Sequence, residues 1–196
     1  MLDFNKAYGK VEIIEDGSNG RIKLSAINRQ SEDRKTKLKN NFVGVLDTAD
    51  SRLVLELCQE LNKKLPDVSD DEIVVGMYKS GIIMAGYLAM VRKAKFTWST
   101  PDEFGDFQDA VQFQEGHRKT ATHYFYGLKP GNKIILVEDE ITSGLGVADL
   151  TKVLRDYNIE VVAICSILET INFGGRDLIK TKTGLELESL VKVEVA

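Results

Sequence analysis

Two neighbouring carboxylates stand directly before a turn of small residues in the stretch IILVEDEITSGLG, residues 134–146. Glu138 and Asp139 could accept hydrogen bonds from sugar hydroxyls or hold Mg²⁺ through water. The turn that follows, residues 142–147, offers hydroxyl groups, two glycines that let a ligand approach the backbone, and the amides of a predicted helix start. The pattern therefore indicates a ligand that carries hydroxyl groups beside a phosphate.

A second glycine-bounded turn lies between Gly76 and Gly81. It follows the apolar run Ile73–Val75, just as the first turn follows Ile134–Val137, and such short apolar runs are typical of strands covered on both faces. In an open parallel sheet, ligands bind at the carboxyl ends of the strands. We therefore expect the two turns to face one crevice.

The elements around these turns predict two βαβ units and hence an α/β fold, with a mostly parallel central sheet flanked by helices. The first unit comprises strand Ile73–Val75, a helix to about Lys93 and a strand near Lys95–Trp98. The second comprises strand Ile134–Val137, a helix over Val147–Tyr157 and strand Val161–Leu168. Residues 99–132 between the units are polar and weakly periodic, and long segments of this kind are usually functional or disordered.

The N-terminal residues 1–46 predict a small β-rich appendage. We expect KVEII and RIKLSAI to form a hairpin across EDGSNG, because Asp-Gly and Asn-Gly pairs are strong turn formers. From Asp47 the apolar residues recur at helical spacing, behind the capping candidates Asp47 and Thr48. An amphipathic helix is therefore expected to precede the first βαβ unit.

The composition limits the class of protein. A chain of 196 residues with 43% hydrophobic content can bury one substantial core. The sequence has neither a run of about 18 apolar residues, the length that spans a bilayer, nor the apolar core of a secretion signal, so we expect a cytoplasmic protein without a membrane partner. The formal charge of −4 argues against a nucleic-acid partner. Cys58 and Cys165 lie in apolar segments without metal-ligand spacing, which predicts buried reduced thiols.

The stretch ILVEDEITSGLG resembles the signature of type I phosphoribosyltransferases that binds 5-phosphoribosyl 1-pyrophosphate (PRPP). VVGMYKSGIIMAGYLA, residues 74–89, resembles the pyrophosphate-binding loop of the family, and the tail 169–193 is similar to the end of orotate phosphoribosyltransferases. The resemblance implies the type I phosphoribosyltransferase fold. It assigns residues 1–46 to a hood, 47–168 to the PRPP-binding core and 169–196 to a C-terminal segment that closes the core or hood.

The resemblance further implies an enzyme of nucleotide metabolism, a pentosyltransferase that joins the ribose 5-phosphate of PRPP to a nucleobase-like acceptor and releases pyrophosphate. Mg²⁺ would be the cofactor, held through its waters by Glu138 and Asp139, and Lys79 would stabilise charge on the leaving pyrophosphate. A flexible loop would fall at 115–127, and the family commonly forms homodimers. The implied PRPP-binding residues are Tyr78, Lys79, Ser80, Gly81, Glu138, Asp139, Glu140, Ile141, Thr142, Ser143, Gly144, Leu145 and Gly146. The candidates for closing the flexible loop are His117, Arg118 and Lys119, which could equally be an ordinary exposed basic cluster.

Two residues depart from the family pattern. Glu140 occupies a position that is usually aliphatic in orotate enzymes, and an acidic residue there is similar to phosphoribosyltransferase-like proteins of bacterial stress-response gene clusters. Gly146 stands where many members carry a Ser or Thr that contacts the 5′-phosphate. Glu140 is interpreted as a solvated turn residue or as a third carboxylate beside the metal, and Arg176 as a contact to the acceptor or a helix cap. A regulator that binds PRPP or a nucleotide without catalysis is the alternative function, and the acceptor stays open.

Overall fold

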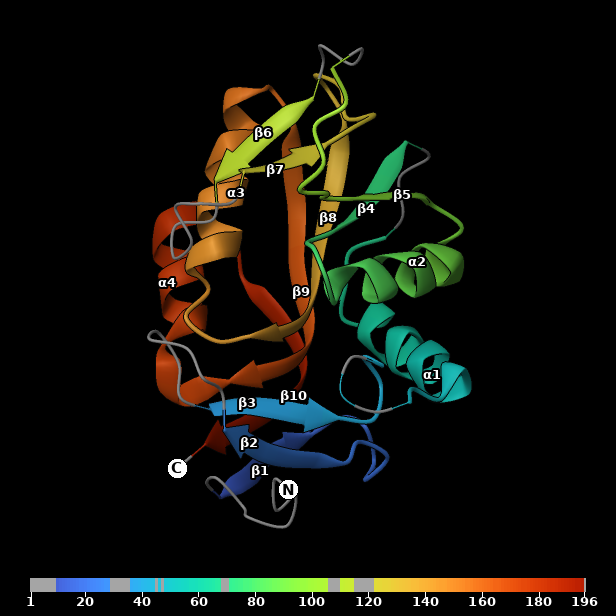
Figure 1. Ribbon diagram of the computed structural model, residues 1–196, viewed down its shortest axis with the longest axis vertical. Helices are drawn as coiled ribbons and strands as arrows, with labels where there is room; N and C mark the ends of the chain where they lie inside the picture. Colours follow the sequence, from blue (N-terminus) through green and yellow to red (C-terminus); the bar gives the residue numbers. More distant parts are fainter. Residues whose placement is uncertain are drawn as a thin grey trace.

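The computed structural model of the protein describes residues 10–28, 36–44, 46, 48–67, 71–105, 110–114 and 122–195. Within these ranges the chain forms one six-stranded sheet, two two-stranded sheets and helices on both sides of the large sheet (Figure 1). The strands are β1 Val11–Asp16, β2 Leu24–Asn28, β3 Thr36–Asn40, β4 Glu72–Gly76, β5 Lys95–Trp98, β6 Val111–Gln114, β7 Thr122–Phe125, β8 Lys133–Ile141, β9 Glu160–Thr170 and β10 Leu187–Val195. The helices are α1 Ser51–Asn62, α2 Gly81–Arg92, α3 Leu145–Asp156 and α4 Gly175–Thr183, with a 3₁₀ turn η1 at Ile171–Phe173.

The large sheet has the strand order β1-β10-β9-β8-β4-β5. All neighbouring pairs from β10 to β5 are parallel, and β1 pairs antiparallel with β10. Every residue of β4 is buried, as are Ile134–Val137 of β8, because helices or loops cover both faces of these central strands. The predicted α/β fold with a mostly parallel sheet is confirmed.

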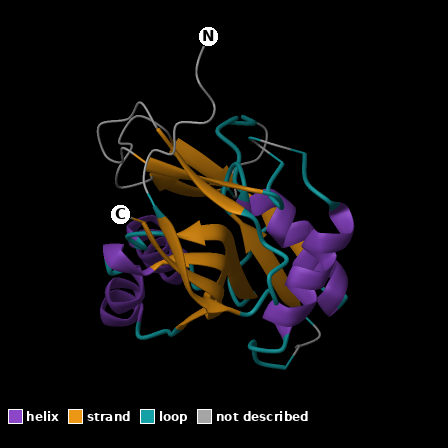
Figure 2. Cartoon of the chain, turned by 90° about the horizontal axis from the view of Figure 1, so that it is seen from below, coloured by secondary structure: helices purple, strands orange, loops and turns teal. Residues whose placement is uncertain are grey.

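Two helical layers flank this sheet (Figure 2). The helices α1 and α2 contribute to one hydrophobic cluster, whereas α3, α4 and the β6-β7 pair contribute to a second cluster. The chain leaves β4 through α2 to reach β5 on one side, and it leaves β8 through α3 to reach β9 on the other. Since β4 and β8 are neighbours, the direction of winding reverses between them, and this is the position where open α/β sheets bind ligands.

The predicted N-terminal hairpin is wrong. The turn itself forms, because Asp16 accepts hydrogen bonds from the amides of Ser18 at 2.8 Å and Gly20 at 2.7 Å. The strand before it, β1, pairs with β10 from the far end of the chain, and β2 pairs with β3 instead. Strand β1 therefore pairs with the edge of β10 rather than with β2, its neighbour in the sequence.

The predicted amphipathic helix forms as α1 but begins later than expected. Its N-cap is Asp50, whose side chain accepts a hydrogen bond from the amide of Arg52 at 2.9 Å. Of the two predicted caps, Thr48 precedes the helix and Asp47 lies outside the described residues. The carboxylate of Asp50, bonded to the amide two residues ahead, therefore caps the start of the helix.

The two cysteines are buried and free, as predicted. Desolvation raises the pKa of the Cys58 thiol to about 12 and also raises the pKa of Cys165 well above its usual value. Both thiols are therefore protonated at neutral pH. Among the described residues, none of the helices combines the length and apolar character that crossing a membrane requires.

Candidate functional site

Two helix starts flank the point where the winding of the sheet reverses. The turn 77–80 leads from β4 into α2, and the turn 142–144 leads from β8 into α3. The N-cap residues Ser80 and Gly144 make no side-chain capping hydrogen bond, and the Ser143 hydroxyl only reaches 3.5 Å from the amide of Leu145. The first-turn amides of both helices are therefore positioned to bind anions.

The carboxylate of Glu138 lies beside the start of α2. A Cβ atom placed on Gly81 would be 3.1 Å from Glu138 Oε2, and one placed on Gly76 would overlap the carbonyl oxygen of Gly81. Gly76 pairs with Val137, the residue that precedes Glu138. This close approach of two backbones explains why both ends of the turn are glycine, and it places Glu138 beside the start of α2.

The three carboxylates belong to strand β8 itself rather than to the turn. The strand was expected to end at Val137, but the ladder to β9 continues through Glu138, opposite Ser166, and Glu140, opposite Leu168. The carboxylate of Glu140 accepts a hydrogen bond from the hydroxyl of Thr170 at 2.7 Å. Glu140 is therefore tied to the end of β9, an arrangement that the sequence interpretation did not include.

Asp139 has the most perturbed carboxyl group of the site. Desolvation and the adjacent charge of Glu140 raise the pKa of Asp139 to about 7, although Lys37 on β3 opposes the shift. Strand β3 belongs to the N-terminal two-stranded sheet, so this sheet brings a cation toward the acidic residues. A cation or a ring of hydroxyl donors at Asp139 would favour its charged form.

The turn 142–144 rests against the start of α4. Gly144 has a φ of +68°, and a Cβ atom there would lie 2.7 Å from the carbonyl oxygen of Gly175. A Cβ atom on Gly175 would in turn overlap the carbonyl oxygen of Thr142. Gly175 therefore allows the start of α4 to pack directly against this turn.

The turn 77–80 carries exposed side chains. The Lys79 ammonium lies 5.5 Å from the centroid of the Tyr78 ring, and the Tyr78–Lys79 peptide bond is cis. The amide of Tyr78 donates to the hydroxyl of Ser99 at 2.8 Å, and the Tyr78 ring lies 5.9 Å from the ring of His123 on β7. Ser99 and His123 come from the segment between the βαβ units, and no local sequence signal indicates these contacts.

The three candidate closing residues, His117, Arg118 and Lys119, fall within residues 115–121, outside the described residues. Strands β6 and β7 border that segment and pair antiparallel, so part of the region predicted as a long loop is a two-stranded sheet. Among the described residues, His, Cys, Asp and Glu side chains form no group of three or more that could hold a metal ion.

The chain belongs to the phosphoribosyltransferase family, because a sequence profile of the family described as "Phosphoribosyl transferase" matches residues 29–195. It is 30% identical over 142 residues to a hypoxanthine/guanine phosphoribosyltransferase of Methanobacterium lacus, covering 72% of this chain and 73% of the relative. It is also 30% identical over 137 residues to the orotate phosphoribosyltransferase of Thermotoga maritima, covering 70% of this chain and 62% of the relative.

Solved structures agree on the fold. The adenine phosphoribosyltransferase of Rhodothermus marinus superposes with a TM-score of 0.67 at 18% identity, over 86% of this chain and 93% of that one. The Giardia lamblia enzyme complexed with 9-deazaadenine gives a TM-score of 0.66 at 19% identity, over 89% and 95%. The resemblance to type I phosphoribosyltransferases with orotate-type relatives, the expected fold and the assignment as a phosphoribosyltransferase enzyme are confirmed.

Proposed function

We propose that this enzyme binds the 5′-phosphate of PRPP on the amides of residues 142–146 and its pyrophosphate on the amides of residues 79–81, and transfers the phosphoribosyl group to a nitrogen of a nucleobase-like acceptor. One observation carries the proposal: two helix starts, whose N-cap residues make no side-chain capping hydrogen bond, follow the neighbouring strands β4 and β8, and the carboxylate of Glu138 lies beside the start of α2. Two neighbouring anion positions with a carboxylate beside one of them suit a sugar that carries a phosphate at one end and a pyrophosphate at the other.

In the proposed reaction the acceptor nitrogen forms a bond to C1 of the ribose while the bond from C1 to the pyrophosphate oxygen breaks. The electron pair of that bond leaves with pyrophosphate, and the acceptor loses its proton to solvent. Positive charge develops on the ribose ring, where Glu138 and Asp139 would accept hydrogen bonds from its hydroxyls. Negative charge develops on pyrophosphate, where the Lys79 ammonium would stabilise it. The protein thus contributes positioning and charge stabilisation.

The donor set fits Mg²⁺. This ion keeps several of its waters and is commonly held by one or two carboxylates together with substrate phosphates. Glu138 and Asp139 supply such a pair near the carboxyl end of the central strand β8. The described residues provide no larger cluster of ligands. When bound, Mg²⁺ would neutralise the pyrophosphate charge, with Glu138 and Asp139 holding it through its waters.

The proposal assigns the remaining parts of the chain as follows. His117, Arg118 and Lys119 would close over bound PRPP, and the hood of residues 1–46 would contact the acceptor above the core of residues 47–168. Residues 169–196 would close the core from the other side. Tyr78, Ser80, Glu140 and Ile141 would complete the PRPP site, and the enzyme would act as a cytoplasmic homodimer.

The experiment is a thermal-shift titration with PRPP and Mg²⁺ on the wild type, Asp139→Asn and the control Asp149→Asn. Asp149 lies on α3 and pairs with Lys182 at 3.6 Å, so the control removes a carboxylate outside the site. We expect a Mg²⁺-dependent stabilisation of about 2.7 kcal/mol at a hundredfold excess over Kd in wild type and control, and none in Asp139→Asn.

Pyrophosphate release is then measured with orotate, hypoxanthine, guanine and adenine as acceptors. Release with one of these bases in wild type and Asp149→Asn, together with its loss in Asp139→Asn, is the expected result. PRPP binding without release for any acceptor would favour the regulator instead. Absence of PRPP binding in the wild type would overturn the proposal as a whole.

A further inference from the structure

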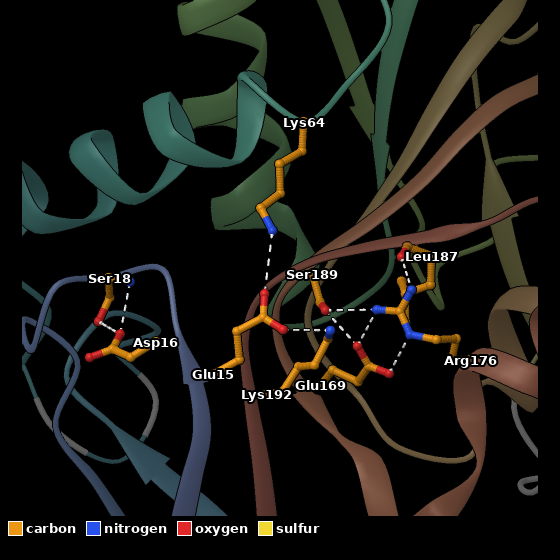
Figure 3. Close-up of polar contacts among 9 residues, drawn as sticks. All are labelled: Glu15, Asp16, Ser18, Lys64, Glu169, Arg176, Leu187, Ser189 and Lys192. Carbon is orange, nitrogen blue, oxygen red and sulfur yellow. Dashed lines mark hydrogen bonds and ion pairs between the residues drawn. The ribbon is translucent and has the colours of Figure 1, made fainter.

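An ion pair between Glu169 and Arg176 lies near the turn 142–146, and the proposed reaction does not use it. Both oxygens of Glu169 accept hydrogen bonds from Arg176, at 2.9 Å from Nε and 2.5 Å from Nη2. The hydroxyl of Ser189 donates to Glu169 Oε2 at 2.5 Å, and Arg176 also donates to the carbonyl oxygen of Leu187 at 2.6 Å (Figure 3). The Glu169 side chain is only 4% exposed and that of Arg176 is 34% exposed, so a buried carboxylate on β9 is joined to α4 and β10 by a half-buried guanidinium.

This ion pair reaches the turn through adjacent residues on both sides. Glu169 is the register partner of Ile141, the last residue of β8, and its neighbour Thr170 donates the hydrogen bond to Glu140. Arg176 follows Gly175, whose backbone packs on Thr142 without room for a side chain. The same pair therefore anchors the strand that leads into the turn and the helix that lies behind it.

A purely structural pair would not need this location. Burying the Glu169 carboxylate is costly even with a paired guanidinium, and apolar residues of similar volume often replace such a pair at equal or greater stability. The fork of an arginine, by contrast, fixes the distance and the angle between two elements. At this place the pair fixes the relative positions of backbone segments. This matters because the backbone amides of the turn bind a phosphate only if they point to one position.

We propose that Arg176 and Glu169, together with the hydrogen bond from Thr170 to Glu140, are positioning residues that hold the turn 142–146 in its phosphate-binding geometry. The inference rests on the proposed function, since it concerns the turn assigned to the 5′-phosphate. It replaces the two sequence interpretations of Arg176, as an acceptor contact or a helix cap, with a role behind the turn.

The test measures dissociation constants by calorimetry for ribose 5-phosphate and, separately, for pyrophosphate with Mg²⁺. The variants are Arg176→Lys, which keeps the charge and loses the fork, and Thr170→Val, which loses the hydroxyl at nearly the same volume. We expect each to weaken ribose 5-phosphate binding by about tenfold or more, because small misplacements of a binding group are costly, and to change pyrophosphate binding by less than about twofold.

The chain offers a matched control. Arg92 binds Glu72 through the same fork, at 2.6 Å from Nε and 2.9 Å from Nη2, and Glu72 is the first residue of β4, at the end of the strand opposite the turns. Because the Arg92 side chain is 1% exposed and that of Arg176 is 34% exposed, Arg92→Lys should lower the melting temperature at least as much as Arg176→Lys, without a selective loss of ribose 5-phosphate binding. Equal ribose 5-phosphate affinity in Arg176→Lys and Arg92→Lys would overturn the inference.

A double variant, Glu169→Met with Arg176→Met, separates stability from geometry. We expect it to recover the melting temperature of the wild type but not its affinity for ribose 5-phosphate. Recovery of both would show that the pair only stabilises the fold and would contradict the positioning role. A wild type that binds neither ribose 5-phosphate nor pyrophosphate would overturn the proposed function itself, which is a different outcome from a wild type that binds both.

Discussion

The ring of His123 lies against the ring of Tyr78, with centroids 5.9 Å apart and planes inclined by 44°. Tyr78 belongs to the turn assigned to pyrophosphate, and His123 lies on β7, which directly follows residues 115–121. A second connection supports the first, since Thr100 and Tyr124 exchange backbone hydrogen bonds at 3.0 and 2.8 Å, and the preceding Ser99 binds the amide of Tyr78. The β6-β7 sheet and the turn assigned to pyrophosphate are therefore linked by direct contacts.

The contact between these two rings predicts an effect on pyrophosphate. His123→Ala should weaken pyrophosphate binding by about tenfold, because the Tyr78 ring loses its neighbour, whereas His123→Phe should keep most of the affinity through ring packing. Phe113→Leu perturbs the same small sheet at the residue paired with His123 and serves as the stability control. Calorimetry with pyrophosphate and Mg²⁺ is the measurement, and equal affinities of the Ala and Phe variants would contradict the prediction.

The raised pKa of Asp139 predicts an unusual dependence of stability on pH. Its carboxyl group has a pKa of about 7 in the folded protein and about 3.8 when unfolded, so the folded state holds a proton that the unfolded chain has released between these values. This group therefore favours folding more as the pH falls from 8 toward 4. Asp139→Asn removes the buried charge and should stabilise the ligand-free protein at pH 8 by about 1 to 3 kcal/mol.

The difference in melting temperature between Asp139→Asn and wild type, followed from pH 8 to pH 4, isolates this residue. Other carboxyl groups act in the opposite direction, since a hydrogen bond from Lys192 lowers the pKa of Glu15, but they contribute equally to both proteins. The difference should shrink toward zero at low pH. A constant difference across the range would show that the Asp139 charge does not cost stability.

Gly144 and Gly184 separate backbone strain from a steric clash. Both have positive φ, +68° and +75°, but a Cβ atom on Gly144 meets the backbone of Gly175, whereas one on Gly184 meets nothing within 4 Å. Gly184→Ala should cost about 1 kcal/mol from φ alone. Gly144→Ala should cost about 2 kcal/mol more, because backbone must move, and should also abolish ribose 5-phosphate binding. Urea unfolding and calorimetry test both parts, and equal costs for the two substitutions would contradict the proposed packing.

Replacing Lys79 should change the rate of the reaction through electrostatics without changing the stability of the fold. Its side chain is exposed, so Lys79→Met should leave the melting temperature within about 1 °C of the wild type. It should lower kcat by at least about tenfold, because the cation acts as charge grows on the leaving pyrophosphate. Lys133→Met, at the opposite end of β8, removes another exposed lysine as control. Equal rates in the two variants would exclude a role for Lys79 in the reaction.

The sequence alone predicts the parts of this site that depend on local pattern. The apolar runs of β4 and β8 mark the central strands, because a strand that is buried on both faces consists mainly of apolar residues. The glycines mark the turns. The end of β8 is predicted too early, since Glu138 and Glu140 read as turn residues although they remain paired with β9.

Contacts between distant segments are the part that local pattern could not supply. Nothing near Gly144 indicates that Gly175 lies behind it, and nothing near Tyr78 indicates His123. The same reason explains the wrong hairpin, because the partner of β1 is some 180 residues further along the chain, as in the pair Val11 and Val195. Turn chemistry is local, but strand pairing also depends on which edge the rest of the fold leaves open.

The position of β10 between β1 and β9 has a consequence for synthesis on the ribosome. The βαβ core can assemble as it emerges, but β1, which is made before β10, has no partner in the large sheet until residues 187–195 have left the exit tunnel. During translation its unpaired edge is a target for other nascent chains and for chaperones. A pause in translation at any point between β1 and β10 would therefore leave β1 without its partner in the large sheet.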